Sequence, residues 1–322
     1  MSAYLVFDAL KSKKISLQQT MSVSERAWKM PGSRMFIDPK MKVPVEDLIK
    51  GMIVQSGNDA TVVLAEGVGG TVERFVQMMN EQAKLLGMNN TSYKNPEGLT
   101  EAGHTTTARD LATLATRLMR DFPEYVPTYA IKKYRYPGTP AANDSNRNLL
   151  LFKDPTVDGL KTGHTDAAGY CLVATTKRDL PNVGPRRLMA IVLGTNSEIA
   201  RANEAQKLLN WGYTAFDAVK LFDAGQAVAT PAIWKGKAAT VKLGRSDALV
   251  VAVPTGTASQ IKTQLVRPEP LVAPVIRGQA IGSLQIYRGE QLWVDMPLQA
   301  LDTVEQAGVL GRAWDALRLW IK

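Results

Sequence analysis

Three short groups of residues in this sequence carry side chains that can act together on a substrate with a carbonyl and a carboxylate. They are Ser56-Gly57-Asn58, Lys161-Thr162-Gly163 and Arg201. A lysine on an edge strand can place its ammonium in a cleft, where it hydrogen-bonds a hydroxyl and favours developing negative charge. Ser56 and Asn58 offer a hydroxyl relay and an amide for the carbonyl. Thr162 and the planar fork of Arg201 can fix the carboxylate, and Gly163 lets a substrate backbone approach and pair with the strand.

Each of these groups has an ordinary structural explanation when it stands alone. A single Ser-Gly-Asn is usually a turn, a single Lys-Thr-Gly is common by chance, and Arg201 alone fits a solvated helix position. His164, which follows the second group, fits a surface residue better than a base. The three groups in this order, each in a suitable element, are far more specific than any one of them.

The first part of the chain is predicted to be helical. Apolar residues at helical spacing predict helices over 45–54, 60–68 and 71–87, and the sequence QSGND separates the first two. Thr107, followed three residues later by an aspartate, has the form of a capping box that opens another helix. The Ser-Gly-Asn group therefore lies in a tight loop between two helices.

Beyond the helical part, the hydrophobic period changes to that of strands. The segments 157–163, 170–179 and 186–196 are strand candidates joined by short connectors, which favours an antiparallel meander. A helix over 197–216 follows and is expected to pack back on the sheet. Helices around an antiparallel sheet make an α+β domain, with the Lys-Thr-Gly group on the strand that borders the sheet.

The C-terminal part of the chain has a different pattern. Short strand-like runs between 238 and 300, separated by turn residues, predict a small all-β domain. The tail 309–322 has helical spacing and fits a helix that lies in a membrane interface; a terminal helix docked on its own domain is the alternative. Its apolar face is formed by Leu310, Ala313, Trp314, Leu317, Trp320 and Ile321, and its polar face by Arg312, Asp315, Arg318 and Lys322.

The composition indicates an ordinary globular protein. The 322 residues are 45% hydrophobic and 21% charged. The net charge of +9 fits a protein that binds nucleic acid, an anionic membrane or an acidic polymer, and does not choose among them. No aromatic residues interleave a basic cluster, so nucleic-acid binding has weak support. The one cysteine, Cys171, is expected to be a small buried hydrophobe. With only two histidines the sequence does not favour a structural zinc site.

The three groups resemble the motifs of active-site serine penicillin-binding proteins and β-lactamases, which combine S-x-x-K, S-[DG]-N and K-T-G. More closely, LIKGMIVQSGNDATVVLAEGVGG, VDGLKTGHTDAAGYCLVATTKRD and EAQKLLNWGYTAF are similar to low-molecular-weight D-alanyl-D-alanine carboxypeptidases of the penicillin-binding protein 5/6 type, peptidase family S11. The resemblance covers essentially the whole chain. It implies an α+β, penicillin-binding-protein-like transpeptidase fold over 1–218, a small all-β domain over 219–302 and an amphipathic membrane-interface helix over 303–322.

The resemblance also implies roles for individual residues. Ser56 and Asn58 match the second motif and Lys161 the third, and these three are the implied catalytic residues. The implied substrate-binding residues are Thr162, Gly163, His164 through its backbone N–H in the oxyanion hole, Arg201 near the terminal carboxylate, and Arg147 close to the site. The resemblance implies no cofactor and no metal.

The family's nucleophile and base are the serine and lysine of S-x-x-K, and the sequence lacks them where they are expected. The only S-x-x-K runs from Ser259 to Lys262, in a strand-like run where the two side chains would point to opposite faces. MSAYLVFDALKSKKI is similar to the segment that directly follows S-x-x-K on its helix, and it is not a signal peptide. We expect a chain that begins downstream of its own nucleophile, through an internal start or truncation. A natural pseudoenzyme that lost the serine is the alternative.

The expected activity is that of a periplasmic serine D-Ala-D-Ala carboxypeptidase, attached peripherally to the inner membrane by its terminal helix. Its partners would be peptidoglycan stem peptides as substrates and β-lactams as inhibitors, with no nucleic acid; homodimer formation stays open. The chain as it stands would be inactive, because no acyl-enzyme forms without the serine. A class A β-lactamase and a non-catalytic peptidoglycan-binding scaffold are the rival interpretations.

Overall fold

The computed structural model describes residues 1–321, with side chains up to residue 320. The chain forms two compact units. Unit 1 consists of Met1–Arg178 and Arg186–Trp211, and unit 2 of Asp179–Pro185 and the residues from Gly212 onward. Each unit has hydrophobic core residues of its own. The domain boundaries expected at 218 and 302 stay predictions.

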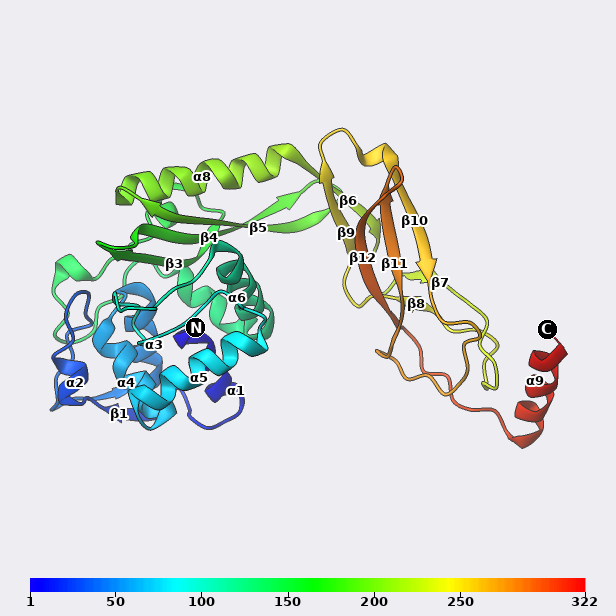
Figure 1. Ribbon diagram of the computed structural model, residues 1–322, viewed down its shortest axis with the longest axis horizontal. Coiled ribbons are helices and arrows are strands. Elements are labelled where there is room, and N and C mark those ends of the chain that lie inside the picture. The colour runs from blue at the N-terminus through cyan, green and yellow to red at the C-terminus, as the bar shows by residue number, and fades with distance from the viewer. Residues whose placement is uncertain (322) are drawn as a thin grey trace. The chain divides into compact units, whose positions relative to one another are not determined.

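Helices dominate unit 1 up to Ala130 (Figure 1, blue to green). The predicted helices over 45–54, 60–68 and 71–87 are confirmed, although α4 begins two residues earlier than predicted, at Asn58, and α5 is shorter at both ends. Every residue from Asn58 to Ala65 is buried, so α4 is surrounded by other elements. The elements are α1 (Ser2–Lys11), β1 (Thr20–Ser22), α2 (Glu25–Trp28), β2 (Lys42–Pro44), α3 (Val45–Val54), α4 (Asn58–Gly69), α5 (Val72–Leu85), α6 (Ala108–Asp121), η1 (Pro123–Ala130), η2 (Ala141–Asn143) and α7 (Leu150–Lys153).

Side-chain caps fix where two of these helices begin. Thr107 Oγ1 accepts a hydrogen bond from the Asp110 N–H at 3.1 Å at the start of α6, so the helix start predicted from the sequence is confirmed. Thr71 Oγ1 accepts from the Arg74 N–H at 3.1 Å at the start of α5. Both contacts satisfy a backbone donor that the first turn of a helix leaves without an intrahelical partner.

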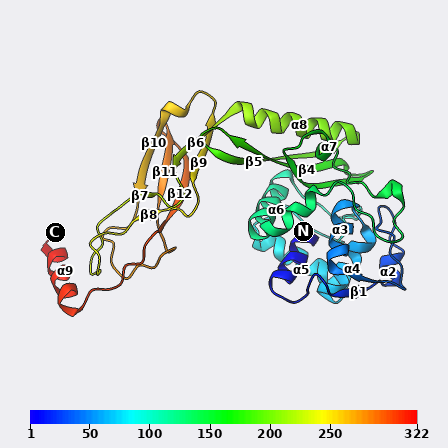
Figure 2. The same ribbon diagram turned by 180° about the vertical axis from the view of Figure 1, so that it is seen from behind.

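A three-stranded sheet completes unit 1. Its strands are β3 (Val157–Thr165), β4 (Gly169–Leu180) and β5 (Gly184–Thr195), in that order, and β3 pairs antiparallel with β4. β3 is an edge strand, so the Lys-Thr-Gly group borders the sheet as predicted. Helix α8 (Glu198–Ala215) runs along one face of the sheet, and the N-terminal helices lie on the opposite side (Figure 1, Figure 2).

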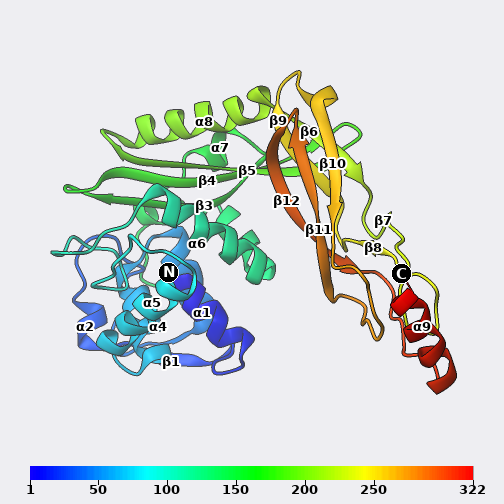
Figure 3. The same cartoon turned by 45° about the vertical axis from the view of Figure 1, so that its right-hand side comes forward.

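Unit 2 is built mainly from strands, as the sequence predicts (Figure 3, yellow to orange). One sheet has the order β10-β11-β12-β8-β7, and β6 pairs with β9 in a second. Leu249 and Val251 of β9 share a core with Leu284 and Ile286 of β11, so the two sheets bury a common apolar layer. The strands are β6 (Phe216–Phe222), β7 (Ala227–Ala229), β8 (Leu243–Gly244), β9 (Leu249–Pro254), β10 (Ile261–Val266), β11 (Ala280–Arg288) and β12 (Gln291–Ala300).

The structure corrects three details of the prediction for unit 2. The run 238–244 forms only the two-residue strand β8, and β6 and β7 were not predicted. β6 begins directly at the end of α8, so the helix predicted over 197–216 ends one residue earlier, at Ala215. Most residues of β6 are half-buried, so buried and exposed positions do not alternate along it. A strand without this period of two is hard to predict from its sequence.

The final helix, α9 (Val309–Ile321), contacts the rest of unit 2 through its polar side. The Lys235 N–H donates to Asp315 Oδ2 at 2.6 Å, and the Arg318 guanidinium lies 5.7 Å from the Trp234 ring centroid. The described residues of its predicted apolar face stay exposed, led by Leu310 at 88% and Trp320 at 85%, whereas Leu319 is half-buried. The side chain of Ile321 and all of Lys322 lie outside the described residues. Within residues 1–321, no helix has the length and hydropathy needed to cross a membrane.

Candidate active site

The predicted site residues come together around one cavity of unit 1, about 760 Å³ in volume. The loop before α4, the strand β3 and the first turns of α8 each contribute side chains to it. Elements far apart in the sequence therefore build a single site. All eight predicted residues line the cavity: Ser56, Asn58, Arg147, Lys161, Thr162, Gly163, His164 and Arg201.

Ser56 and Lys161 are in direct contact. Lys161 Nζ donates to Ser56 Oγ at 2.9 Å and to the Thr162 carbonyl at 2.7 Å. Ser56 stands between α3 and α4 with a φ of 57°, in the left-handed region that costs a non-glycine residue about 1–2 kcal/mol. Strained backbone of this kind persists where the surrounding structure fixes it, and here it holds the hydroxyl against the lysine.

The environment of Lys161 lowers its pKa to about 7. Burial is the main cause, because it disfavours the charged ammonium, and the positive charges of Arg147 and Arg201 add to the effect. The side chain keeps some exposure toward the cavity. Lys161 can therefore exchange a proton with a neighbouring group near neutral pH.

Asn58 is held by the loop that precedes β2. Its backbone N–H donates to the Ser33 carbonyl at 2.8 Å, and its Nδ2 donates to the Pro31 carbonyl at 2.7 Å. The next residue, Asp59, is 1% exposed, and one of its carboxylate oxygens accepts from the Met35 N–H at 2.8 Å. These contacts fix the Ser-Gly-Asn loop, with one amide hydrogen of Asn58 committed to the protein.

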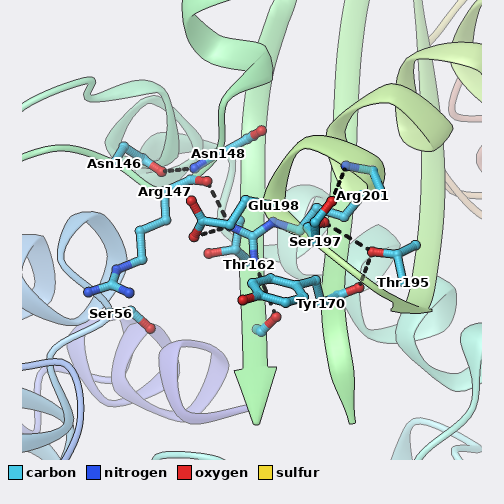
Figure 4. Close-up of polar contacts among 12 residues, drawn as sticks. Ser56, Asn146, Arg147, Asn148, Thr162, Tyr170, Thr195, Ser197, Glu198 and Arg201 are labelled. Carbon is cyan, nitrogen blue, oxygen red and sulfur yellow. Dashed lines mark hydrogen bonds and ion pairs between the residues drawn. The ribbon is translucent and has the colours of Figure 1, made fainter. Parts of the chain in front are cut away.

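Arg201 is almost completely buried, at 2% exposure, on the first turns of α8. Its Nη2 donates to the Arg147 carbonyl at 2.9 Å and lies 3.4 Å from Glu198 Oε1, and its Nη1 donates to the Gly163 carbonyl at 3.4 Å. The guanidinium carbon lies 5.5 Å from the Tyr170 ring centroid. Figure 4 shows these side chains converging beside Thr162. The guanidinium is thus fixed at the cavity wall by backbone carbonyls.

The wall beyond Gly163 is formed by the pairing of β3 and β4. His164 lies opposite Tyr170, and their rings stack with centroids 3.9 Å apart. Cys171 lies opposite Gly163. The prediction that Cys171 is buried is wrong, since it is half-buried and lines the cavity. The reason is the period of the strand: Leu172 faces the core, which turns its neighbour to the opposite face.

Three residues near the site were missed by the sequence analysis. Glu198 pairs with Arg201, Tyr170 packs on both His164 and Arg201, and Asp59 holds the loop of the second motif. The spacing of three between Glu198 and Arg201 on a predicted helix is a signal that could have found the pair. The role of Tyr170 depends on strand register, which the sequence does not give.

Within residues 1–321, no group of three or more His, Cys, Asp and Glu side chains is placed to hold a metal ion. The only S-x-x-K belongs to unit 2, whereas every cavity residue belongs to unit 1. Ser259 is exposed in the short 3-10 helix η3 (Ala258–Gln260), which corrects the strand expected there, and Lys262 lies in β10.

Two family models match the chain. Residues 1–197 match Peptidase S11, D-alanyl-D-alanine carboxypeptidase, and residues 216–306 match the penicillin-binding protein 5 C-terminal domain. The chain belongs to the D-alanyl-D-alanine carboxypeptidase family. The family recognised from the motifs and the expected fold class, α+β followed by a β-rich domain and a final helix, are both confirmed.

Named relatives match over most of their length. The D-alanyl-D-alanine carboxypeptidase DacC of Escherichia coli K12 is 38% identical, over 98% of this chain and 79% of the relative. DacA of Haemophilus influenzae is 36% identical, over 100% of this chain and 81% of the relative. The solved structure of penicillin-binding protein 5 from Haemophilus influenzae superposes with a TM-score of 0.81 at 34% identity, covering 95% of this chain and 88% of that one.

A solved relative also contains a β-lactam. Penicillin-binding protein D2 of Listeria monocytogenes, in its ampicillin-bound form, matches with a TM-score of 0.57 at 30% identity, over 66% of this chain and 83% of that one. The family therefore acts on D-Ala-D-Ala peptides and binds β-lactams. The roles assigned above to single residues of this chain stay predictions.

Proposed function

We propose that this protein is a serine-type D-Ala-D-Ala carboxypeptidase that removes the terminal D-Ala from peptidoglycan stem peptides through an acyl-enzyme. The observation that carries the proposal is the contact between Lys161 and Ser56, 2.9 Å long, in a cavity that also holds Arg201. A hydroxyl–ammonium pair near neutral pKa serves proton movement, and a fixed guanidinium serves a terminal carboxylate. The cavity thus offers groups for proton transfer and for binding the terminal carboxylate of a peptide.

In the complete site, an S-x-x-K serine attacks the carbonyl of the penultimate D-Ala while its lysine takes the proton. Backbone N–H groups, including that of His164, stabilise the oxyanion. Ser56 and Lys161 pass a proton to the leaving amine, and Asn58 orients the peptide. D-Ala departs, and water then hydrolyses the ester to regenerate the serine. Of the groups in this scheme, unit 1 contains Ser56, Asn58, Lys161 and the backbone N–H of His164, and its sequence has no S-x-x-K.

The chain of 322 residues is therefore proposed to bind peptide or penicillin in the cavity without forming an ester. The second candidate function is a non-catalytic peptidoglycan-binding scaffold, which would hold a peptide in this same cavity. A β-lactamase is disfavoured, because residues 216–306 match a penicillin-binding protein domain. An assay for β-lactam turnover separates that rival.

The experiment is the intact mass of the natural protein from its source cells, with and without a labelled penicillin. A mass above 35.1 kDa with one covalent label is the expected result and supports the enzyme. A mass equal to that of this chain, with no label, would favour the scaffold. If a protein whose unlabelled mass equals that of this chain takes up the label, a residue of this chain is the nucleophile, which contradicts the mechanism above.

We further propose that α9 attaches the protein peripherally to the inner membrane, on the periplasmic side. What supports this is the exposure of its apolar residues, since Trp314 is 62% and Leu317 50% exposed while the polar side contacts unit 2. A helix docked on its own domain would bury those residues instead. Tryptophan on the apolar face and basic residues opposite suit an interface with anionic lipids.

A further inference from the structure

Arg201, the residue expected to receive the terminal carboxylate of a substrate, already has a carboxylate beside it. Glu198 Oε1 lies 3.4 Å from Arg201 Nη2, three residues earlier on α8. Both residues line the same cavity. Figure 4 shows the Glu198 carboxylate turned toward the Arg201 guanidinium, next to the Arg147 backbone. An acidic side chain is thus already paired with the guanidinium that an incoming carboxylate would contact.

The two partners differ in their freedom to move. Arg201 has 2% of its side chain exposed and is fixed by the carbonyls of Arg147 and Gly163, at 2.9 and 3.4 Å. Glu198 has 48% of its side chain exposed. Because exposed carboxylates regain water when they leave an ion pair, moving Glu198 away costs little. The arginine stays in place and the glutamate is the exchangeable partner.

We propose that Glu198 is a specificity-determining residue that acts as an internal competitor for the carboxylate site of Arg201. The inference rests on the proposed function, since a D-alanyl-D-alanine peptide ends in a free carboxylate. Such a ligand replaces Glu198 at Arg201, whereas a ligand that ends in an amide leaves the Glu198–Arg201 pair intact. Glu198 therefore weakens the binding of every carboxylate at this point, that of the substrate and that of the departing D-alanine alike.

The variant Glu198→Gln tests the competitor directly, because glutamine keeps the hydrogen-bond acceptor and removes the charge. Glu204→Gln is the matched control: Glu204 lies on the same helix, has 49% of its side chain exposed and pairs with Lys207 three residues on. The probes are N-acetyl-D-alanyl-D-alanine and its C-terminal amide. Binding is followed by NMR at the backbone amides of Thr162, Gly163 and His164.

The expected result is that E198Q binds the free-acid peptide about two- to fivefold more tightly than the wild type, the range typical of partly exposed ion pairs. The amide peptide and the E204Q control should show no change. Equal or weaker binding of the acid by E198Q would overturn the inference, because Glu198 would then only hold Arg201 in place. If the wild type shows no saturable shift with the free acid, the proposed function fails as well, and the inference falls with it.

Discussion

The ammonium group of Lys161 joins two motifs that lie 105 residues apart in the sequence. Its three hydrogens face two oxygen atoms of the protein, Ser56 Oγ at 2.9 Å and the Thr162 carbonyl at 2.7 Å. Burial and two nearby guanidinium groups lower the pKa of Lys161 to about 7. The group therefore changes its charge near neutral pH. A neutral Lys161 can accept a proton through Ser56 and a charged one can return it.

The burial of Lys161 predicts a pH-dependent stability. The unfolded chain protonates this lysine below its ordinary pKa of 10.5, whereas the folded chain does so only below about 7. Between these values the unfolded state binds more protons, so wild-type stability rises with pH. Lys161→Met removes this dependence. Its stability advantage over the wild type should be largest near pH 7 and shrink as the pH approaches 10.5.

Urea unfolding of both chains across this pH range measures the difference. Lys207→Met is the control for loss of an exposed lysine, since the Lys207 side chain is 71% exposed. A difference between K161M and the wild type that stays constant from pH 7 to 10 would show that Lys161 titrates normally in the folded chain.

At the scale of elements, Asp59 ties the start of α4 to the chain before β2. Its carboxylate accepts from the backbone N–H groups of Met35 and Phe36, each at 2.8 Å, and from that of Ala60 at 2.9 Å. Hydrogen bonds to a charged acceptor contribute more than neutral ones, about 1.5–3 kcal/mol each. These contacts hold the first turn of α4, which follows Ser56, against the chain before β2.

Asp59→Asn is expected to destabilise unit 1 by about 2–4 kcal/mol, because an amide nitrogen would replace one acceptor and face a backbone donor. The urea midpoint of unfolding measures this loss. Asp38→Asn is the control: Asp38 Oδ1 accepts from the Lys40 N–H in a turn, and its loss should cost below about 1 kcal/mol. An unchanged midpoint for D59N would mean that the buried contacts of Asp59 are not needed to hold the loop.

The sequence predicted long elements well and their contacts poorly. The helices α3, α4 and α5 and the strands β3 to β5 follow from periodicity and capping residues, and the site residues follow from motifs that resemble a known family. The pairing of Tyr170 with His164 could not be predicted, since it depends on strand register. The exposure of Cys171 was misjudged because a short apolar run has no visible period.

The edge strand β3 gives a second prediction at this scale. A Cβ at Gly163 would lie 3.8 Å from its nearest neighbour, the Cβ of Cys171, which is an ordinary contact. Gly163→Ala should therefore fold with unchanged stability. A methyl group there would obstruct a peptide pairing with the strand, so we expect binding of N-acetyl-D-alanyl-D-alanine to weaken by tenfold or more. Unchanged NMR affinity for this peptide would show that the peptide does not pair at Gly163.

At the scale of the whole molecule, two units of different construction are joined in one chain. Unit 1 contains all the cavity residues, and unit 2 includes the helix α9, whose large residues Leu310, Trp314 and Trp320 are exposed in the described part of the chain. Asp315 and Arg318 hold that helix by its polar side. The arrangement leaves Leu310, Trp314 and Trp320 available to an external apolar phase, which a docked amphipathic helix would not do.

This arrangement predicts binding to lipid vesicles that contain an anionic phospholipid. The wild-type chain should sediment with such vesicles, and Trp314→Glu should reduce the bound fraction about tenfold, because a charge on the apolar face must be desolvated to enter the interface. Trp211→Glu is the control, since Trp211 is also exposed, at 59%, but lies in unit 1. Added salt should weaken the wild-type binding, as the basic residues of α9 contribute by charge. Equal sedimentation of W314E and the wild type would mean that α9 does not contact the membrane, whereas loss of binding in W211E alone would move the contact to unit 1.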